Sequence, residues 1–472
     1  MIMQRCVRQK RADVGDDPPD TASSGLVQFT NAALVMPDGL VTGELWMDPE
    51  SRTIVDPQDR FWQRSDTPQK HRILDCHGLL LCPGMIDVML FGAFGIYFSS
   101  LGAEGTPAAL EASEAMRRVC ARLPELGITA FCPAIRAYEL PAADVHRLLE
   151  RLAPSSSPDD QPGARVLGVH LDGPFFGREY APESTAPSHL KERLDGAALR
   201  EALGPRGCEA VKVITLAPEL PGAIEATKKL ASEGVVVGLG RTGAGLARCE
   251  EAVRAGARLI SHVYSHMPPF HHRDPGPIGL LGERGPEGSA CGPHEPTEPT
   301  VPPGGNGGNG GNGNGGAHDT NAAAGNGGAT FYSLAVAGQH KFTINLAHST
   351  HPAGLVLLSC RRSLIFSEEA GEHKDDDDEE EDELAPLDGT LLSCARRLWH
   401  CSGSADPAAA LLCGSAHPAS LLGLAPAKGT LLPGADADLL LLDPDSLEVR
   451  ACYVRGKLTW ADEARHGAFW YH

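Results

Sequence analysis

Polar residues that could do chemistry follow short apolar runs in the middle of this chain of 472 residues. His170 and Asp172 belong to the run VLGVHLD, while Arg241 follows VVVGLG and His262 follows RLIS. Imidazoles and carboxylates bind divalent metals, and they also serve as general acids and bases. A guanidinium has no lone pair to give and keeps its proton in proteins, so Arg241 cannot be a metal ligand.

The segments around these residues predict the elements that position them. Short β-rich runs alternate with helical segments such as 222–234 and 246–256, at the spacing of βα units. Continuous apolar strands are buried on both faces, which requires a parallel sheet covered by helices. We therefore expect an α/β fold, a (β/α)8 barrel of the TIM type, in which polar residues at the carboxyl ends of strands face the active site.

The two ends of the chain are β-rich, punctuated by turns and poor in helix. Residues 26–83 and 428–472 are expected to form one small β-sandwich beside a barrel spanning residues 84–427. Residues 1–25 are expected to be a disordered tail. The Gly/Asn-rich stretch 304–316 and the acidic run that ends at Glu383 lack apolar side chains, so we expect low-complexity insertions in surface loops, at residues 285–328 and 368–386.

Composition excludes several classes of partner. The net charge is −20, and nine consecutive acidic residues occupy Asp375 to Glu383, a balance that argues against nucleic acid and anionic membranes. The acidic run could bind cations or a basic partner, although such blocks are most often solvated. The 13 cysteines form no CxxC pair, which indicates reduced thiols in a cytoplasmic protein. No apolar stretch is long enough to span a membrane.

A series of motifs running from about Leu26 to Trp460 resembles the N-acetylglucosamine-6-phosphate deacetylases of the amidohydrolase superfamily. In chain order these motifs are PGMID, FGAFGIYFS, HLDGPFFGRE, TLAPEL, SHVYSHMPPFHHRDPG, SAHPASLLGL and KGTLLPGADADLLLLD. The resemblance implies a (β/α)8 barrel with a small β-sandwich, a homodimer, and hydrolysis of the acetamide of N-acetylglucosamine 6-phosphate. It also implies one divalent, zinc-like metal ion that polarises the amide and activates a water.

The resemblance assigns metal positions to three residues, two of which have changed. His262 matches a metal histidine, and Asp172 replaces a glutamate, which withdraws the carboxylate by one methylene. Arg241 stands where the other histidine belongs. Two alternatives follow: Arg241 forms an ion pair with Asp172 in the space of the metal, or a metal is held by Asp172, His262 and a substitute such as Cys360 or His266. His262 could equally be a hydrogen-bonded histidine at a strand end.

Other positions of the site include some residues that match the family and some that do not. Cys360 stands at the position of the catalytic aspartate, and a thiol is a poor replacement for a carboxylate that shuttles a proton. The resemblance implies that substrate is contacted at Ser265, His266, Arg273 and His340, with Arg273 on the phosphate. Met89 and Phe91 replace a glutamine and an asparagine on the first strand. His266, His271 and His272 could form a new metal site, but their place in a substrate loop favours ordinary loop histidines.

Three hypotheses remain from the sequence. The first is a deacetylase of phosphorylated amino sugars with a degraded metal site and weak activity. The second is a catalytically inactive relative that binds a sugar phosphate or a protein, with Arg241 supplying the charge of the metal. The third is an imperfect gene model, because low-complexity segments stand where family sequence is missing.

Overall fold

The computed structural model describes the chain in segments. These are residues 25–58, 71–102, 112–154, 161–181, 185–204, 207–263, 266–269, 271–281, 331–335, 355–358, 390–462 and 470–471. The expected tail, apart from residue 25, and both expected insertions, 285–328 and 368–386, lie outside the described residues. The boundaries predicted for those segments therefore stay predictions.

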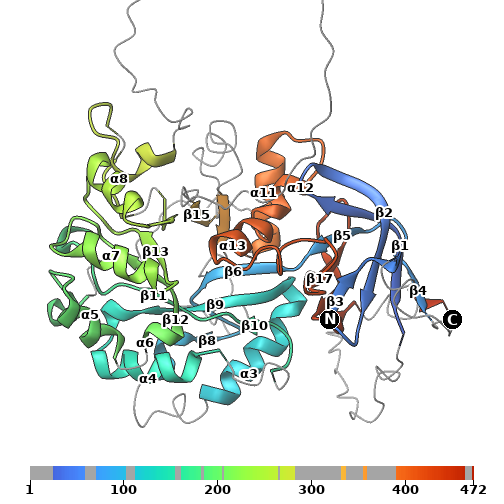
Figure 1. Ribbon diagram of the computed structural model, residues 1–472, viewed down its shortest axis with the longest axis horizontal. Helices are drawn as coiled ribbons and strands as arrows, with labels where there is room; N and C mark the ends of the chain where they lie inside the picture. The colour runs from blue at the N-terminus through green and yellow to red at the C-terminus, as the bar shows by residue number, and fades with distance from the viewer. Residues whose placement is uncertain are drawn as a thin grey trace, which may run out of the picture.

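A parallel sheet of nine strands forms the larger part of the molecule (Figure 1). Its main path runs β10-β9-β11-β12-β13-β14-β15-β16, and β6 pairs with β9. The strands are β6 (Met85–Leu90), β9 (Ile128–Arg136), β10 (Arg165–Val166), β11 (Val169–Asp172), β12 (Val211–Leu216), β13 (Val236–Leu239), β14 (Leu259–Ile260), β15 (Phe331–Ala335) and β16 (Leu355–Leu358). All four residues of β11 and of β13 are buried, as the continuous apolar runs predicted.

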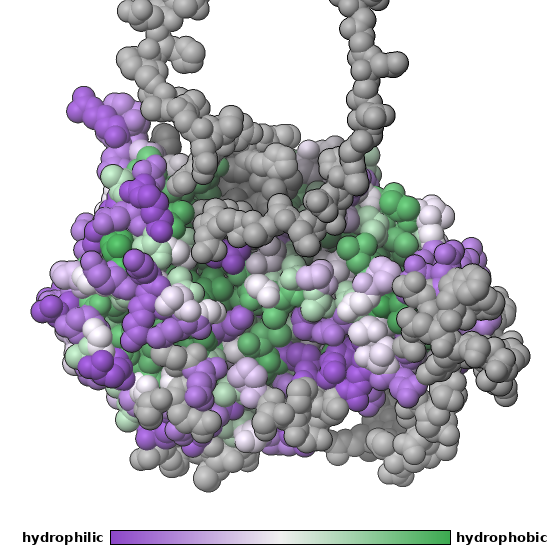
Figure 2. Space-filling view, viewed as in Figure 1, coloured by the Kyte–Doolittle hydropathy of each residue, from purple (hydrophilic) through white to green (hydrophobic). Residues whose placement is uncertain are grey.

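Helices cover the outer face of this sheet. They are α3 (Ala112–Arg122), α4 (Ala142–Leu152), α5 (Gly196–Leu203), α6 (Gly207–Ala210), α7 (Ala223–Ser232), α8 (Leu246–Arg254) and α11 (Leu391–Ser402). In α7, Ala223, Ala226, Thr227 and Leu230 are buried, at the spacing of one helical face. On the face seen in Figure 2, hydrophilic and hydrophobic side chains alternate in small areas.

Short 3₁₀ helices occupy several of the connections. They are η1 (Phe98–Gly102), η2 (Leu123–Leu126), η3 (Ala137–Glu139), η5 (Arg178–Tyr180), η6 (Pro187–His189) and η7 (Gly276–Leu281), and a two-stranded hairpin joins β7 (Gly92–Ala93) to β8 (Ile96–Tyr97). η3 directly follows β9, and η5 and η6 lie in the connection after β11. These three therefore flank the carboxyl ends of neighbouring strands.

A second sheet brings the two ends of the chain together. Its path is β19-β18-β17-β5-β1-β2-β3, with β4 on β1 and β20 on β4. The strands are β1 (Val27–Met36), β2 (Gly39–Asp48), β3 (Thr53–Val55), β4 (Arg72–Asp75), β5 (Leu80–Pro83), β17 (Leu439–Leu442), β18 (Val449–Val454), β19 (Lys457–Ala461) and β20 (Trp470–Tyr471). β5 and β17 pair antiparallel, so strands from the two ends of the chain share one sheet.

The remaining helices join the two parts of the molecule. α12 (Ala408–Leu412) contacts β1 and β2 of the terminal sheet, whereas α13 (Ala416–Leu421) contacts β6 and β16 of the parallel sheet. One apolar core extends through both parts, because Val35 and Leu80 of the terminal sheet belong to the same buried cluster as Phe131 and Leu171. No helix in the described segments is both long and apolar enough to cross a membrane.

Candidate functional site

Strand register places several polar side chains at one end of the parallel sheet. Asp172, the last residue of β11, is paired with Arg136 of β9 on one side and with Thr215 of β12 on the other. Thr215 is in turn paired with Gly238 of β13. Parallel strands end at the same edge of a sheet, so these residues lie at its carboxyl end, as predicted for Asp172.

Arg241 and His262 follow the next two strands. Leu239 of β13 is paired with Ile260 of β14, so Arg241 and His262 each lie two residues beyond the same pair. Both residues have left-handed backbones, with φ of 49° and 54°. Such conformations are costly for residues other than glycine and concentrate at functional sites.

Asp172, Arg241 and His262 meet at the carboxyl end of the sheet. The Nε atom of Arg241 lies 3.6 Å from Asp172 Oδ2, and the two side chains are 4 % and 0 % exposed. His262 Nε2 lies 4.0 Å from the same oxygen. The structure therefore brings together the three residues that the sequence singled out, and it contains the ion pair that was one of the two alternatives.

Aromatic rings hold the guanidinium of Arg241. Its central carbon lies 5.0 Å from the ring centre of Tyr138 and 5.5 Å from that of Phe176. The Nη2 atom of Arg241 donates a hydrogen bond of 3.2 Å to the Tyr138 hydroxyl. Cation–π contact is strongest where water is excluded, so these rings fix the orientation of a buried charge.

Phe91 and Arg136 also contribute side chains near His262. The ring of Phe91 is nearly parallel to that of His262, at 15° and 6.4 Å between centres. Arg136 lies over the same Phe91 ring at 4.9 Å, and it also forms an ion pair of 2.9 Å with Glu139. Phe91 therefore contributes an aromatic face where the resemblance expected a polar side chain.

Burial keeps the imidazole of His262 neutral. Loss of hydration, followed by the positive charge of Arg241, lowers the pKa of His262 to about 3. The same two causes, in the same order, lower the pKa of His266. At neutral pH the imidazoles of His262 and His266 are therefore uncharged.

A second polar cluster lies beside the first and is fully hydrogen-bonded. Burial lowers the pKa of His170 to about 4, so its ring is neutral and its Nδ1 donates to the Val88 carbonyl at 2.7 Å. Nε2 then accepts from the Thr215 hydroxyl at 2.8 Å, and Thr215 accepts from Ser261 at 2.9 Å. Because the Val88 carbonyl can only accept, it fixes which atom donates in each of the three hydrogen bonds from His170 to Ser261.

A glycine in VVVGLG makes room for this network. A Cβ atom at Gly238 would lie 2.7 Å from Ser261 Oγ and 3.3 Å from Thr215 Oγ1. Any larger residue at position 238 would push the two hydroxyls apart. The glycine in β13 therefore leaves space for the hydrogen bond between Thr215 of β12 and Ser261, which follows β14.

The divalent metal implied by the resemblance does not fit these residues. A dication held by Asp172 would lie about 4 Å from the guanidinium of Arg241, where repulsion is on the order of 8 kcal/mol at an effective dielectric constant of about 20. The 4.0 Å between Asp172 Oδ2 and His262 Nε2 also exceeds the roughly 3.4 Å of a tetrahedral zinc site. Within the segments that the structure describes, no three His, Cys, Asp or Glu side chains are grouped to hold a metal.

The residues predicted to contact substrate are only partly described. Arg273 is exposed, and its backbone N–H donates to His271 Nδ1 at 3.2 Å. His266 has a left-handed backbone, and its carbonyl accepts from the Thr242 N–H at 3.1 Å, which ties this loop to the turn that carries Arg241. Ser265, His340 and Cys360 lie outside the described residues, so their predicted roles stay predictions.

The histidines of the loop after β14 are held by local contacts. His271 and His272 are tilted against each other with ring centres 4.4 Å apart. The neighbouring Asp274 accepts a hydrogen bond of 2.8 Å from the Leu246 N–H at the start of α8, and another of 3.0 Å from Gly276. The prediction that these are ordinary loop histidines stays a prediction.

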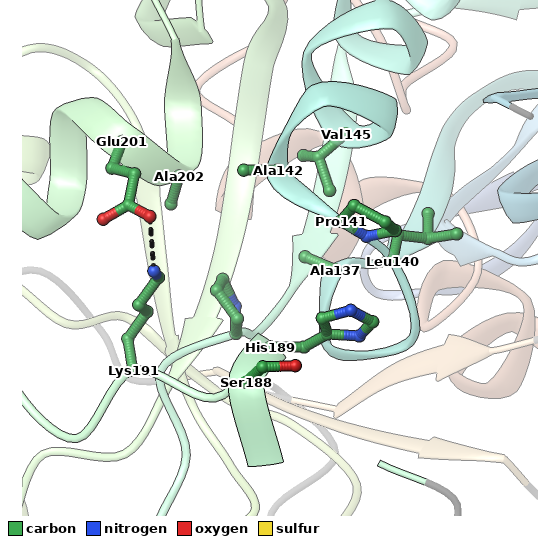
Figure 3. A pocket seen from close by; sticks show the side chains of 11 residues that line it. Ala137, Leu140, Pro141, Ala142, Val145, Ser188, His189, Lys191, Glu201 and Ala202 are labelled. Carbon is green, nitrogen blue, oxygen red and sulfur yellow. Dashed lines mark hydrogen bonds and ion pairs between the residues drawn. The ribbon is translucent and has the colours of Figure 1, made fainter. Parts of the chain in front are cut away.

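A pocket of about 240 Å³ lies between the connections after β9 and β11. Pro174, two residues beyond Asp172, lines it together with Ala137, which precedes Tyr138. Lys191 in this pocket is paired with Glu201 at 2.6 Å (Figure 3). Its lining includes none of the residues of the Asp172 cluster, so the pocket lies beside the candidate site.

Several residues that build the site were not predicted from the sequence. Thr215 and Ser261 end or follow apolar runs, so the rule that selected Asp172 would also have selected them. Tyr138 and Phe176 lie in connections after β9 and β11, and no spacing in the sequence links either residue to Arg241. Their contact depends on how the connections fold back over the strand ends.

Comparison with known proteins places this chain in a family. It is 33 % identical over 465 residues to the N-acetylglucosamine-6-phosphate deacetylase of Bos taurus, covering 94 % of this chain and 98 % of the relative. The Homo sapiens protein of the same name is 32 % identical with the same coverage. This chain belongs to the N-acetylglucosamine-6-phosphate deacetylase family. The resemblance noted in the motifs is thereby confirmed.

Solved structures support the fold of this deacetylase family member. The N-acetylglucosamine-6-phosphate deacetylase of Pasteurella multocida gives a TM-score of 0.66 at 17 % identity, covering 93 % of this chain and all of that chain. A mutant of the Mycobacterium smegmatis enzyme, solved in complex with N-acetyl-D-glucosamine-6-phosphate, gives 0.64 at 21 % identity, with coverage of 92 % and 99 %. No family model matches the chain.

Proposed function

We propose that this protein hydrolyses the acetamide of N-acetylglucosamine 6-phosphate, giving glucosamine 6-phosphate and acetate, at a low rate. Family membership over nearly the whole chain carries this proposal, because the curated relatives are named for this deacetylation and are covered over 98 % of their length. The low rate follows from Arg241 at a metal position and from Cys360 at the position of the proton-shuttling carboxylate.

We assign the substrate contacts by position in the family motifs. Arg273 would bind the 6-phosphate, since a planar guanidinium matches a phosphate dianion, and its exposure leaves it accessible. Ser265, His266 and His340 would contact the sugar. Because a divalent metal does not fit beside Arg241, no step of this proposal passes through one.

Acetate release by the purified full-length protein tests the proposal. N-Acetylglucosamine 6-phosphate would be supplied in EDTA and, separately, with added zinc, cobalt or manganese. Acetate above the level given by an identically prepared Asp172→Ala variant would support hydrolysis, and that variant also controls for a contaminating host deacetylase. If no condition yields acetate above this control, the proposed reaction is wrong.

A second candidate is a catalytically inactive family member that binds an amino-sugar phosphate. The observation that favours it is the buried ion pair of Arg241 with Asp172 at the expected metal position. Glucosamine 6-phosphate should then raise the melting temperature equally with and without EDTA. A shift that disappears in EDTA would rule this candidate out.

We further propose the finer architecture predicted from the sequence. β6 and β16, at opposite ends of the parallel sheet, are in contact, which supports closure into a (β/α)8 barrel. Side chains from β1, β2, β4, β17 and β18 share one core, which supports a sheet folded over itself as a sandwich. Barrel residues 84–427 would then lie between sandwich segments 26–83 and 428–472, and a homodimer would be tested by sedimentation.

A further inference from the structure

The buried pair of Asp172 and Arg241 has hydrogen-bonding capacity that the described residues do not use. Both carboxylate oxygens of Asp172 lack a hydrogen-bond donor among those residues, and the Nε and Nη1 atoms of Arg241 lack an acceptor there. Among the described residues, Nε approaches Asp172 Oδ2 only as an ion pair of 3.6 Å, and Nη2 donates a hydrogen bond to Tyr138. Each unsatisfied buried group costs about 1–3 kcal/mol, and charged groups cost more, so a bound molecule that completes these hydrogen bonds would stabilise the cluster.

The unused atoms define the chemistry of that ligand. The guanidinium can only donate and the ionised carboxylate can only accept, so a partner for both must accept from Arg241 and donate to Asp172. A dication would satisfy Asp172 and be repelled by Arg241, whereas a phosphate would satisfy Arg241 and be repelled by Asp172. A neutral secondary amide carries an acceptor oxygen and a donor N–H.

Neighbouring residues fix the orientation of the Arg241 side chain before a ligand binds. Tyr138 and Phe176 both lie against its guanidinium, and both are buried. The backbone on its carboxyl side is fixed by the Thr242 N–H donating to the His266 carbonyl at 3.1 Å. A donor that is already oriented loses little freedom on binding, so its hydrogen bonds favour the complex.

We infer that Arg241 and Asp172 bind the amide group of the ligand directly and without a metal ion. The carbonyl oxygen accepts from Arg241 and the amide N–H donates to Asp172. This inference rests on the proposed function only in taking an N-acetylated amino-sugar phosphate as the ligand. It concerns binding alone, so it holds for an active enzyme and for an inactive binding protein.

Two sugars that differ in one acetyl group provide the test. N-Acetylglucosamine 6-phosphate and glucosamine 6-phosphate would be titrated by calorimetry into full-length protein in EDTA, with metal content measured on the same sample. We expect the acetylated sugar to bind at least about tenfold more tightly, because the amine lacks the carbonyl acceptor, with less than about a tenth of an equivalent of metal present.

An Arg241→Lys variant probes the orientation of the donors. Lysine keeps the charge but not the planar set of N–H groups, so the preference should fall to about threefold or less. Arg254→Lys is the matched control, because Arg254 lies on α8 with a 65 % exposed side chain, and it should keep the full preference. Melting temperatures of both variants would verify that they fold.

Several results would overturn the inference. These are equal affinity for the two sugars, binding of neither, an undiminished preference in folded Arg241→Lys, or a preference that requires metal. Acetate release is measured in a separate assay, so that the outcome for hydrolysis is independent of the outcome for binding. A metal-free preference without acetate would reject hydrolysis and keep this inference, whereas acetate formed only with a metal-dependent preference would reject this inference and keep hydrolysis.

Discussion

Two polar clusters lie within a few residues of each other at the ends of the same strands. His170 and Asp172 are both on β11, and Ser261 and His262 both follow β14. In the inner cluster of His170, Thr215 and Ser261, each side chain is hydrogen-bonded. In the outer cluster of Asp172, Arg241 and His262, five buried side-chain atoms have no hydrogen-bond partner among the described residues.

This difference in hydrogen bonding indicates that the inner cluster stabilises the fold, whereas the outer cluster is available to bind a ligand. A buried polar network in which every member is satisfied stabilises the strand ends and leaves nothing for a ligand to bind. The outer cluster combines charge, burial and left-handed backbones at Arg241 and His262, which costs stability unless a ligand contributes. We therefore expect changes in the inner cluster to alter stability alone, and changes in the outer cluster to alter stability and binding together.

Removal of one charge from the outer cluster should have the largest effect. Asp172→Ala leaves the guanidinium of Arg241 buried without a counter-ion, and breaking such a pair costs about 3–5 kcal/mol. Equilibrium unfolding in urea measures this loss. A decrease of less than about 1 kcal/mol would mean that water already solvates the outer cluster, and the contrast with the inner cluster would disappear.

The double variant Asp172→Leu/Arg241→Met provides the control for this prediction. Replacing both charges of a buried pair with apolar side chains of similar volume is often neutral or stabilising. The double variant should therefore regain most of the stability lost by Asp172→Ala, while the preference for the acetylated sugar stays abolished. Recovery of that preference would show that the pair does not bind the amide.

The inner cluster should give the protein a pH dependence of stability. The pKa of His170 is lowered from 6.5 to about 4 by burial, so between these values the unfolded chain binds a proton that the folded protein does not. His170 should therefore lower the unfolding free energy by up to about 1.4 kcal/mol per pH unit as pH decreases through this window, in addition to the contribution of His262. His170→Asn keeps a donor for the Val88 carbonyl and should reduce this slope; an unchanged slope would contradict the assignment.

The sequence was sufficient to predict where the strands end but not what meets there. Apolar runs such as VVVGLG and RLIS predicted β13 and β14, and family motifs selected Asp172, Arg241 and His262 as neighbours. Periodicity and strand order are local properties, and they carry over from sequence to structure. The terminal β domain was likewise predictable, because both of its segments are rich in β-branched or apolar residues and turns.

The partners of Arg241 could not be predicted for a physical reason. Tyr138 and Phe176 approach the guanidinium from two connections whose path depends on packing over the strand ends, and no period in the sequence encodes that path. Phe91 illustrates the same limit, since its family position suggested only a lost polar group. In the structure its ring is stacked on that of His262 and also contacts the guanidinium of Arg136.

Removal of the central hydroxyl should measure the strength of the inner cluster. Thr215→Val breaks the bonds to His170 and to Ser261, leaving two buried polar groups unsatisfied, so we expect a loss of about 1–3 kcal/mol by urea unfolding. Thr227→Val is the matched control. Thr227 is also fully buried, but its hydroxyl only donates to the Ala223 carbonyl of its own helix, so that variant should lose about 1 kcal/mol or less.

Ser261→Ala should have the smallest effect and bears most directly on the comparison. It removes only the terminal donor, and the Thr215 hydroxyl can still donate to His170, so the loss should be about 0.5–1.5 kcal/mol. The removed hydroxyl lies one residue before His262. If the inner cluster is support only, the variant keeps the tenfold preference for the acetylated sugar; a lost preference would show that the two clusters act as one site.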